Sequence, residues 1–346
     1  MTTEITPEVI TVEKFPQFDV VTDASDHHFY SNKAKSTLSK TGPAQQKIMQ
    51  EWKLLSKDLP DSIYVRVYET RVDLIRAAII GARGTPYHDG LFFFDIAFPS
   101  DYPARPPSVY YWSFGFRINP NLYSSGTVCL SLIHTWSGDK SERWDSNNST
   151  ILQVLLSIQA LVLNERPYFN EPGYGSLSGT KLWDNKSLAY SEDAFVLSCK
   201  TMLWVLWKPL KNFEPLVKQH FIDRAEFILN ACDMYRKGLV KVGMFDGVVK
   251  EGKGVVSKKF ERSIDKLFGD LVGAFARNGA PIGDFVERVR KKEDNAKEEA
   301  EKGRKKSQKP GLVKKLMGIF ARVVMKKKSK TSPVVVVPQD SGQVSQ

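Results

Sequence analysis

Residues 117–130 read Arg-Ile-Asn-Pro-Asn-Leu-Tyr-Ser-Ser-Gly-Thr-Val-Cys-Leu, and the interpretation of the whole chain starts here. An Asn-Pro-Asn turn at 119–121 ends eight residues before Cys129. A cysteine thiol can carry an acyl group as a thioester, and a fixed amide can hydrogen-bond the oxyanion formed when that thioester is attacked. A buried structural role is the commoner fate of a free cysteine. The flanking sequence therefore has to decide between the two interpretations.

Four motifs occur in order around this turn. A segment rich in Phe-Pro, Tyr-Pro and Pro-Pro pairs spans 98–109, and Gly-x-x-Cys-Leu (126–130) follows the turn. Trp144 and the apolar run 151–163 come next. In this order and spacing the chain resembles the ubiquitin-conjugating enzyme family over roughly residues 45–205. The insertion 134–144 and the stretches 157–161 and 167–173 resemble the large hybrid subgroup that combines conjugating and ligase activity and includes plant members.

The resemblance implies a fold, a reaction and a set of site residues. Cys129 is expected to accept ubiquitin as a thioester from an activating enzyme and to transfer it to substrate lysines. Asn121 matches the motif asparagine that stabilises the oxyanion, structures the loop, or does both. Glu171 resembles an acidic residue that orients the incoming lysine, and an ordinary exposed loop acid is the alternative. Asn119 departs from the histidine usual in the family, which excludes a histidine general base at this position.

Neither a metal nor an organic cofactor is expected, because the family's ATP is consumed by the upstream activating enzyme. Cys129, Cys199 and Cys232 form no Cys-x-x-Cys pair, which argues against a zinc site or a disulfide framework and suits a reducing compartment. His27 and His28 have no further metal ligands at usable spacing. The expected partners are ubiquitin, the activating enzyme, protein substrates and a ligase.

Hydrophobic periodicity predicts an α+β domain of the ubiquitin-conjugating fold. A helix is expected over 44–57, and strands over 63–68, 74–80, 91–98 and 108–112 should form a four-stranded antiparallel meander. Helices are then expected over 149–163, 187–206 and 213–236. The first has Ser149 or Thr150 as its cap and is apolar almost all round, so it is expected to be the central buried helix. The domain prediction is a disordered segment 1–40, a conjugating core 41–207, a helical extension 208–283 and a basic tail 284–346.

The chain's net charge of +11 is concentrated in that tail, because residues 288–330 hold 17 Lys or Arg and five Asp or Glu. The remaining residues are close to neutral, so specific nucleic-acid binding is not expected. Apolar residues between 312 and 324 share one helical face bordered by Lys and Arg. Such a helix can lie on an anionic membrane, direct nuclear import or dock a protein. We see no signal peptide in residues 1–15, and we expect a cytoplasmic protein that also reaches the nucleus or membrane surfaces.

Two departures from the family concern the ligase. Ala104 stands where many members have a bulky apolar residue that meets a RING-type ligase, and Trp144 is not followed by the usual Ser-Pro-Ala run. Weak stimulation by generic RING ligases is therefore expected, with substrate selection by the enzyme itself. Two further alternatives are open: a non-catalytic module of the same fold that binds ubiquitin or a ligase, and an enzyme for a ubiquitin-like modifier.

Overall fold

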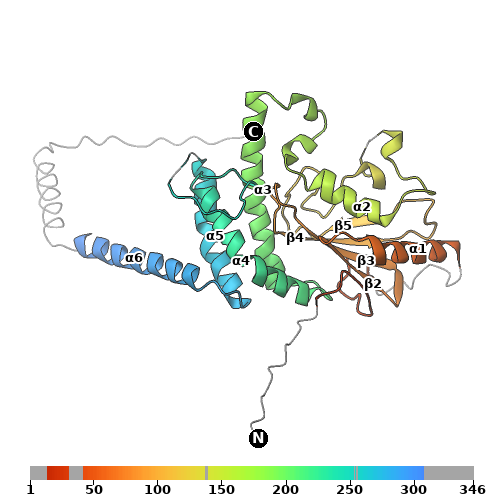
Figure 1. Cartoon of the computed structure of the whole chain (residues 1–346), viewed down its shortest axis with the longest axis horizontal. Helices are drawn as coiled ribbons and strands as arrows, with labels where there is room; N and C mark the ends of the chain where they lie inside the picture. The colour runs from red at the N-terminus through yellow and green to blue at the C-terminus, as the bar shows by residue number, and fades with distance from the viewer. Residues whose placement is uncertain (1–13, 31–41, 137–138, 253, 255, 308–346) are drawn as a thin grey trace, which may run out of the picture. The chain divides into compact units, whose positions relative to one another are not determined.

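The computed structural model describes residues 14–30, 42–136, 139–252, 254 and 256–307. The chain divides into two compact units, residues 1–286 and 287–346, and each is described by itself. The first unit holds one five-stranded sheet and the helices around it (Figure 1).

The sheet has the strand order β1-β2-β3-β4-β5. The strands are β1 (Phe18–Val21), β2 (Ile63–Tyr68), β3 (Arg71–Ile80), β4 (Leu91–Ala97) and β5 (Ser108–Tyr111). Strands β2 to β5 pair antiparallel with their sequence neighbours, so the predicted meander is confirmed. The fifth strand, β1, was not predicted, and it pairs parallel with β2 at the edge.

The prediction that residues 1–40 are disordered is wrong for residues 14–30. Besides forming β1, this segment binds the sheet through polar contacts: Asp26 Oδ1 accepts from Arg76 Nη1 at 2.7 Å, and Asp95 Oδ2 accepts from the His28 amide at 2.7 Å. His27 lies with its ring nitrogen 3.0 Å from the carbonyl of Ile75. The rest of the 1–40 prediction lies outside the described residues.

These contacts explain why both faces of the sheet are buried. Arg66, Arg76 and Asp95 lie in register across β2, β3 and β4, and all three are at most 1% exposed. Burial opposes the charge of Arg76, but two hydrogen bonds from its guanidinium to Asp95, at 2.6 and 2.9 Å, keep its pKa above the ordinary value. The second sheet face is therefore an interior surface of this unit.

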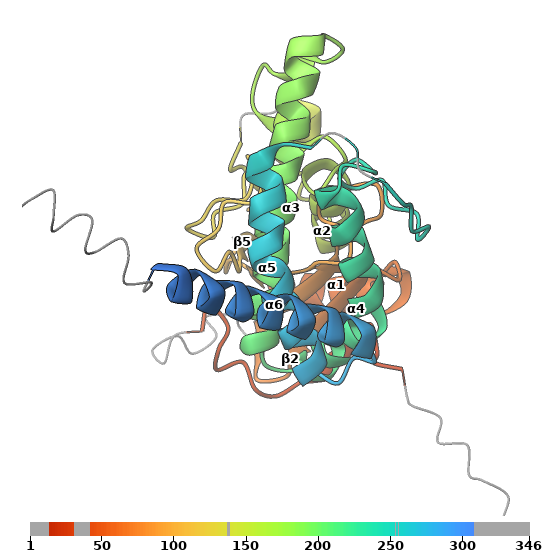
Figure 2. The same cartoon turned by 90° about the vertical axis from the view of Figure 1, so that its left-hand side faces the viewer.

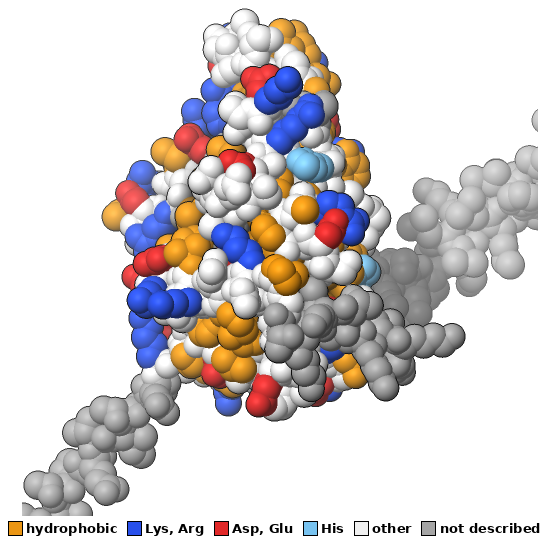
Figure 3. All heavy atoms as spheres, turned by 90° about the vertical axis from the view of Figure 1, so that its right-hand side faces the viewer, with side chains coloured by type: hydrophobic (Ala, Val, Ile, Leu, Met, Phe, Trp, Pro, Cys, Tyr) orange, Lys and Arg blue, Asp and Glu red, His pale blue; other side chains and the backbone are white. Residues whose placement is uncertain are grey.

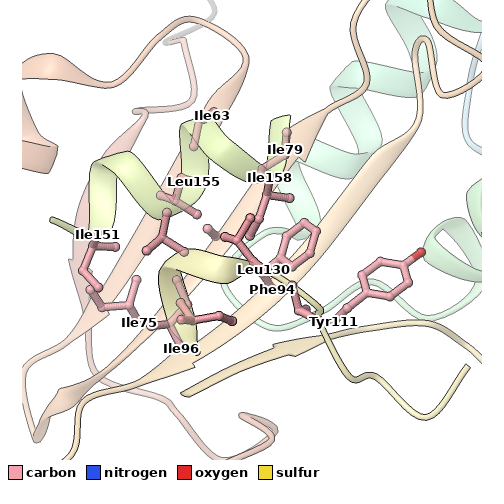
Figure 4. Close-up of a cluster of buried hydrophobic side chains, with 14 of the residues drawn as sticks. Ile63, Ile75, Ile79, Phe94, Ile96, Tyr111, Leu130, Ile151, Leu155 and Ile158 are labelled. Carbon is pink, nitrogen blue, oxygen red and sulfur yellow. The ribbon is translucent and has the colours of Figure 1, made fainter. Parts of the chain in front are cut away.

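The opposite face carries the main hydrophobic core, against α1 (Pro43–Asp58) and α2 (Ile151–Ser157). Figure 4 shows residues 151, 155 and 158 pointing toward isoleucine and phenylalanine side chains of the strands. Thr150 caps α2 with a capping box that involves Gln153, as expected for one of the two candidates. The helix is not buried all round: Leu156 and Leu161 are 39% and 63% exposed, because only one face meets the sheet.

The remaining helices are α3 (Lys181–Trp207), α4 (Glu214–Arg236), α5 (Lys258–Arg277) and α6 (Gly283–Ser307). Shorter helical turns are η1 (Ser131–Ile133), η2 (Lys140–Glu142), η3 (Ile158–Val162, a π-helix that continues α2), η4 (Pro167–Asn170) and η5 (Gly175–Leu177). Helix α5 packs against both α3 and α4. Figures 1 and 2 show α3 between the sheet and α5.

The predicted boundary at residue 207 does not separate two compact units, because the helices that follow are bonded to the sheet's turns. Arg224 Nε donates to Asp89 Oδ1 at 2.6 Å, and the Tyr235 hydroxyl lies 3.0 Å from His88 Nε2. His88 Nδ1 in turn lies 2.7 Å from Asp89 Oδ2. These groups are largely buried, so the segment 208–283 belongs to the same core as the sheet.

Helix α6 crosses from the first unit into the second, which begins at Glu287. The apolar helical face predicted between 312 and 324 lies outside the described residues. On the face of the molecule in Figure 3, positive and negative side chains are interspersed, as expected for a nearly neutral body. Within the described residues, no helix is both long enough and apolar enough to span a membrane.

Candidate active site

Cys129 lies in the loop between β5 and η1, held against the Asn-Pro-Asn turn. Its amide donates to the carbonyl of Asn121 at 2.9 Å, and Asn121 Nδ2 donates to the Cys129 carbonyl at 2.9 Å. Gly126 allows the tight return of the chain: its φ is +91°, and a β-carbon there would lie 2.0 Å from the Tyr110 ring. The loop geometry thus depends on the turn asparagine and on one glycine.

Asn119 is completely buried and forms the centre of a hydrogen-bond network. Its Nδ2 donates to the Tyr87 hydroxyl at 2.8 Å and to the carbonyl of Val162 at 2.7 Å. Its Oδ1 accepts from the amide of Asn121 at 2.9 Å. Asn170 Nδ2 donates to the same Val162 carbonyl at 3.0 Å. Asn119 therefore ties together the turn before Cys129, the end of η3 and the segment that carries Glu171.

Glu171 follows η4 and is paired with a residue that the sequence analysis did not select. Arg117 Nη2 lies 3.2 Å from Glu171 Oε1, and it also donates to the carbonyl of Pro120 at 3.1 Å. The guanidinium carbon stands 4.4 Å from the centre of the Tyr123 ring. Tyr123, acting as a hydrogen-bond donor toward the Cys129 thiol, lowers the pKa of that thiol. The thiol, a phenol, a guanidinium and a carboxylate thus form one connected group.

On another side, Cys129 borders an open groove of about 610 Å³. The groove is lined by apolar and polar side chains from the active-site loop, the insertion and α2 with η3, among them Leu132, Trp136, Arg143, Gln153, Ser157 and Leu161. Cys129 is 8% exposed, whereas Cys199 and Cys232 are 0% exposed. An extended acyl chain could therefore reach the thiol of Cys129 along this groove.

The site and the fold agree with the comparisons to known proteins. The family model "Ubiquitin-conjugating enzyme" matches residues 47–193. The putative ubiquitin-conjugating enzyme E2 38 of Arabidopsis thaliana is 46% identical over 299 residues, which cover 85% of this chain and 90% of that protein. The chain belongs to the ubiquitin-conjugating enzyme family.

Two other relatives are much longer than the chain. The probable ubiquitin-conjugating enzyme E2 24 of Arabidopsis thaliana is 51% identical over 270 residues, but the match covers 29% of its length. The dual E2 ubiquitin-conjugating enzyme/E3 ubiquitin-protein ligase BIRC6 of Homo sapiens is 34% identical over 64% of this chain and 5% of its own length. The resemblance to the family, including a hybrid conjugating and ligase member, is confirmed, and so are the predicted transferase class and the partnership with ubiquitin, activating enzyme and ligase.

The insertion at 134–143 borders the enzyme's groove and also supports the cysteine loop. Thr135 Oγ1 accepts from the Leu130 amide at 2.9 Å and donates to the Val128 carbonyl at 2.6 Å. It thereby binds the residues on both sides of Cys129. From the sequence the insertion was recognised as a feature of the hybrid subgroup, and this supporting role of Thr135 was not predicted. Within the described part of the chain, no three His, Cys, Asp or Glu side chains gather as a metal site would require.

Burial raises the pKa of the Cys129 thiol above its ordinary value. The hydrogen bond from Tyr123 and the charge of Arg117 act in the opposite direction, while the charge of Glu171 raises the pKa further. The enzyme's thiol is therefore mostly protonated at neutral pH. A thiol with a high pKa forms a weak leaving group, so the groups that lower this pKa bear directly on transfer.

The rate at which iodoacetamide alkylates Cys129 should report the pKa of its thiol, because only the thiolate reacts. In the wild type the rate should rise throughout pH 7 to 9 without a plateau. Tyr123→Phe removes a donor that stabilises the thiolate, so the pKa should rise and the rate at pH 8 should fall by about threefold to tenfold. Glu171→Gln is the matched control with the opposite sign, since it removes a negative charge. Faster alkylation of Tyr123→Phe would contradict the role of Tyr123 as a donor that stabilises the Cys129 thiolate.

Proposed function

We propose that Cys129 is the residue that carries ubiquitin as a thioester. The observation that supports it best is the contrast among the three cysteines: Cys129 borders a groove and is partly accessible, whereas Cys199 and Cys232 are completely buried. An activating enzyme has to present the ubiquitin carboxyl group to a thiol that it can reach. Only Cys129 meets this requirement.

The transfer needs no atoms beyond those of the thioester and the acceptor. The ε-amino nitrogen of a substrate lysine attacks the thioester carbonyl, and the resulting oxyanion collapses. The new C–N bond is the isopeptide bond, and the C–S bond breaks with its electron pair passing to Sγ of Cys129. The amine loses one proton, which reaches the released thiolate or water. Cys129 is thus the nucleophile of the first step and the leaving group of the second.

Asn121 serves this reaction in two compatible ways. One of its two amide hydrogens is donated to the Cys129 carbonyl, which fixes the loop. The other is available to the oxyanion, and removing one such donor costs on the order of 10²–10³ in rate in other enzymes. The charge of Glu171 acts on the thiol, and we propose that its carboxylate orients an arriving amine. Asn119 holds both in place without entering the reaction.

The groove beside Cys129 fits the extended C-terminal segment of ubiquitin. It continues onto Leu161, which is 63% exposed and offers apolar contact next to polar groups. A trapped extended chain would keep its carboxyl carbon at the thiol while the rest of ubiquitin remains outside. The insertion residues Trp136 and Arg143 line the same groove, so we assign part of the ubiquitin contact to the insertion.

Substrate selection by the enzyme itself is the second part of the proposal. Ala104 and the residues after Trp144 lack the side chains that usually meet a RING-type ligase, as described above. In the structure Asp145 instead caps a turn, accepting from the Asn147 amide at 2.9 Å. We therefore propose that the enzyme selects substrates itself and depends little on generic RING ligases.

A charging assay tests the assignment of Cys129. With activating enzyme, ubiquitin and ATP, the wild type and Cys232→Ala should form a ubiquitin adduct that thiol reductants cleave, because a thioester exchanges with thiols. Cys129→Ala should form none, and Cys129→Ser should form a reductant-resistant oxyester. Non-reducing and reducing gels provide the measurement.

Each other outcome of this assay has a defined meaning. A reductant-sensitive adduct in Cys129→Ala would refute the nucleophile. Ubiquitin binding without an adduct in the wild type would favour the non-catalytic module. Charging by a ubiquitin-like modifier alone, in a panel of activating enzymes, would replace ubiquitin as the cargo.

We propose that the basic tail determines where the enzyme is localised. Residues 288–330 concentrate the positive charge, while the proposed catalytic residues all precede Pro172. We propose that the tail brings a cytoplasmic enzyme to anionic membrane surfaces, since each basic residue near such a surface contributes about 1 kcal/mol. Nuclear import and protein docking are the competing roles of the same charge.

Cosedimentation with vesicles that contain phosphatidylserine tests the tail. The full chain should bind, binding should fall as salt rises, and a chain ending at Val286 should lose it while charging with ubiquitin at a rate within about twofold of the wild type. The cut keeps Phe285, which packs against Phe268. Equal sedimentation of both chains would refute membrane binding by the tail. Loss of charging in the folded shorter chain would place the tail in the catalytic machinery.

A further inference from the structure

Glu171, the proposed partner of the acceptor lysine, is already paired with another cation in this structure. Arg117 Nη2 stands 3.2 Å from Glu171 Oε1. The same guanidinium has two other contacts, the carbonyl of Pro120 at 3.1 Å and the face of the Tyr123 ring at 4.4 Å. Arg117 is therefore held from three sides, with its guanidinium over the Tyr123 ring.

The backbone around both partners is fixed, whereas their charged ends are open to solvent. Arg117 stands two residues before the buried Asn119. Glu171 follows Asn170, whose side chain donates to the same Val162 carbonyl as Asn119 does. The side chains of Arg117 and Glu171 are 46% and 37% exposed. Exposed ion pairs of this kind are weak and exchange readily with other ions. The pair can therefore open while the loop keeps its geometry.

The pair also acts on the Cys129 thiol from outside the groove assigned to ubiquitin. The groove assigned to ubiquitin is lined by the insertion, α2 and η3, and Arg117, Tyr123 and Glu171 are not among its lining residues. Both charges of the pair nevertheless act on the Cys129 thiol, in opposite directions. With ubiquitin in the groove, the side occupied by Arg117 and Glu171 is the one left for the lysine.

A lysine ammonium and a guanidinium are both cationic hydrogen-bond donors, so they compete for one carboxylate. We propose that Arg117 is a positioning residue that occupies the acceptor-lysine position at Glu171, so that an acceptor has to displace its guanidinium before it reaches the thioester. Arg117 then sets which acceptors succeed: a lysine presented by a bound substrate displaces it, and free amines do so poorly. This inference rests on the proposed roles of Cys129 and Glu171.

Discharge of the preformed thioester to free lysine tests the inference. The enzyme is charged, the activating enzyme is stopped by removing Mg²⁺, and loss of the thioester is followed over a range of lysine concentrations. In Arg117→Gln the half-saturating lysine concentration should fall by about twofold to fivefold, the range of an exposed ion pair. Arg117→Lys, which keeps the charge, should restore much of the wild-type value.

Three controls separate competition at Glu171 from other effects. Arg105→Gln removes an arginine that is likewise exposed and paired, with Asp101 at 2.6 Å, and makes the same change in net charge, so it should leave discharge unchanged. The double variant with Glu171→Gln should behave as Glu171→Gln alone. Hydroxylamine, an uncharged nucleophile at neutral pH, does not compete for Glu171, so it should discharge Arg117→Gln no faster than the wild type.

The outcomes are distinguishable. An unchanged or higher half-saturating lysine concentration in Arg117→Gln would overturn the inference and make Arg117 a support that holds Glu171 in place. An effect of Arg117→Gln that persists without Glu171 would overturn it in favour of a general charge effect. Failure of the wild type to form a thioester before lysine is added would instead overturn the proposed function.

Discussion

The buried amide of Asn119 is the interaction on which the active site depends. An asparagine side chain offers two donor hydrogens and an oxygen acceptor. Asn119 uses both donors, to Tyr87 and Val162, and its oxygen accepts from Asn121. These partners come from the turn before β4, from the end of η3 and from the loop of Cys129. A buried group left without its partner costs about 1–3 kcal/mol, so the network strongly favours one arrangement of these segments.

This arrangement gives Cys129 two different sides. On one, an open groove is lined by α2, η3 and the insertion, whose Thr135 also supports the cysteine loop. On the other, Tyr123, Arg117 and Glu171 place a donor and two opposite charges next to the thiol. Burial raises the pKa of the thiol, so each of these neighbours affects how readily the thiolate forms. A reaction that needs a bound acyl chain on one side and an approaching amine on the other suits this asymmetry.

Much of this fold follows from sequence periodicity, and the exceptions have physical causes. The meander strands and α1 were predictable because their apolar residues face a continuous core. Strand β1 was missed, since it has four residues and its ordered segment is held by polar contacts such as Asp26 to Arg76. Two charged residues within strands, Arg76 and Asp95, were the signal in the sequence that another segment of the chain covers the second sheet face. Cys129, Asn121 and Glu171 were recognisable by motif, whereas Arg117 and Tyr123 belong to no pattern and are identified only by their contacts.

Hydrogen–deuterium exchange of the Asn119→Ala variant tests the central claim most directly. The Cys129 amide is bonded to the Asn121 carbonyl, and the Asn121 amide to Asn119 Oδ1, so both report on the network. We predict that peptides covering 117–131 lose protection in Asn119→Ala, while peptides from β3 exchange as in the wild type. Unchanged protection of 117–131, or an equal loss of protection in β3, would contradict the claim that this amide specifically holds the active-site loop.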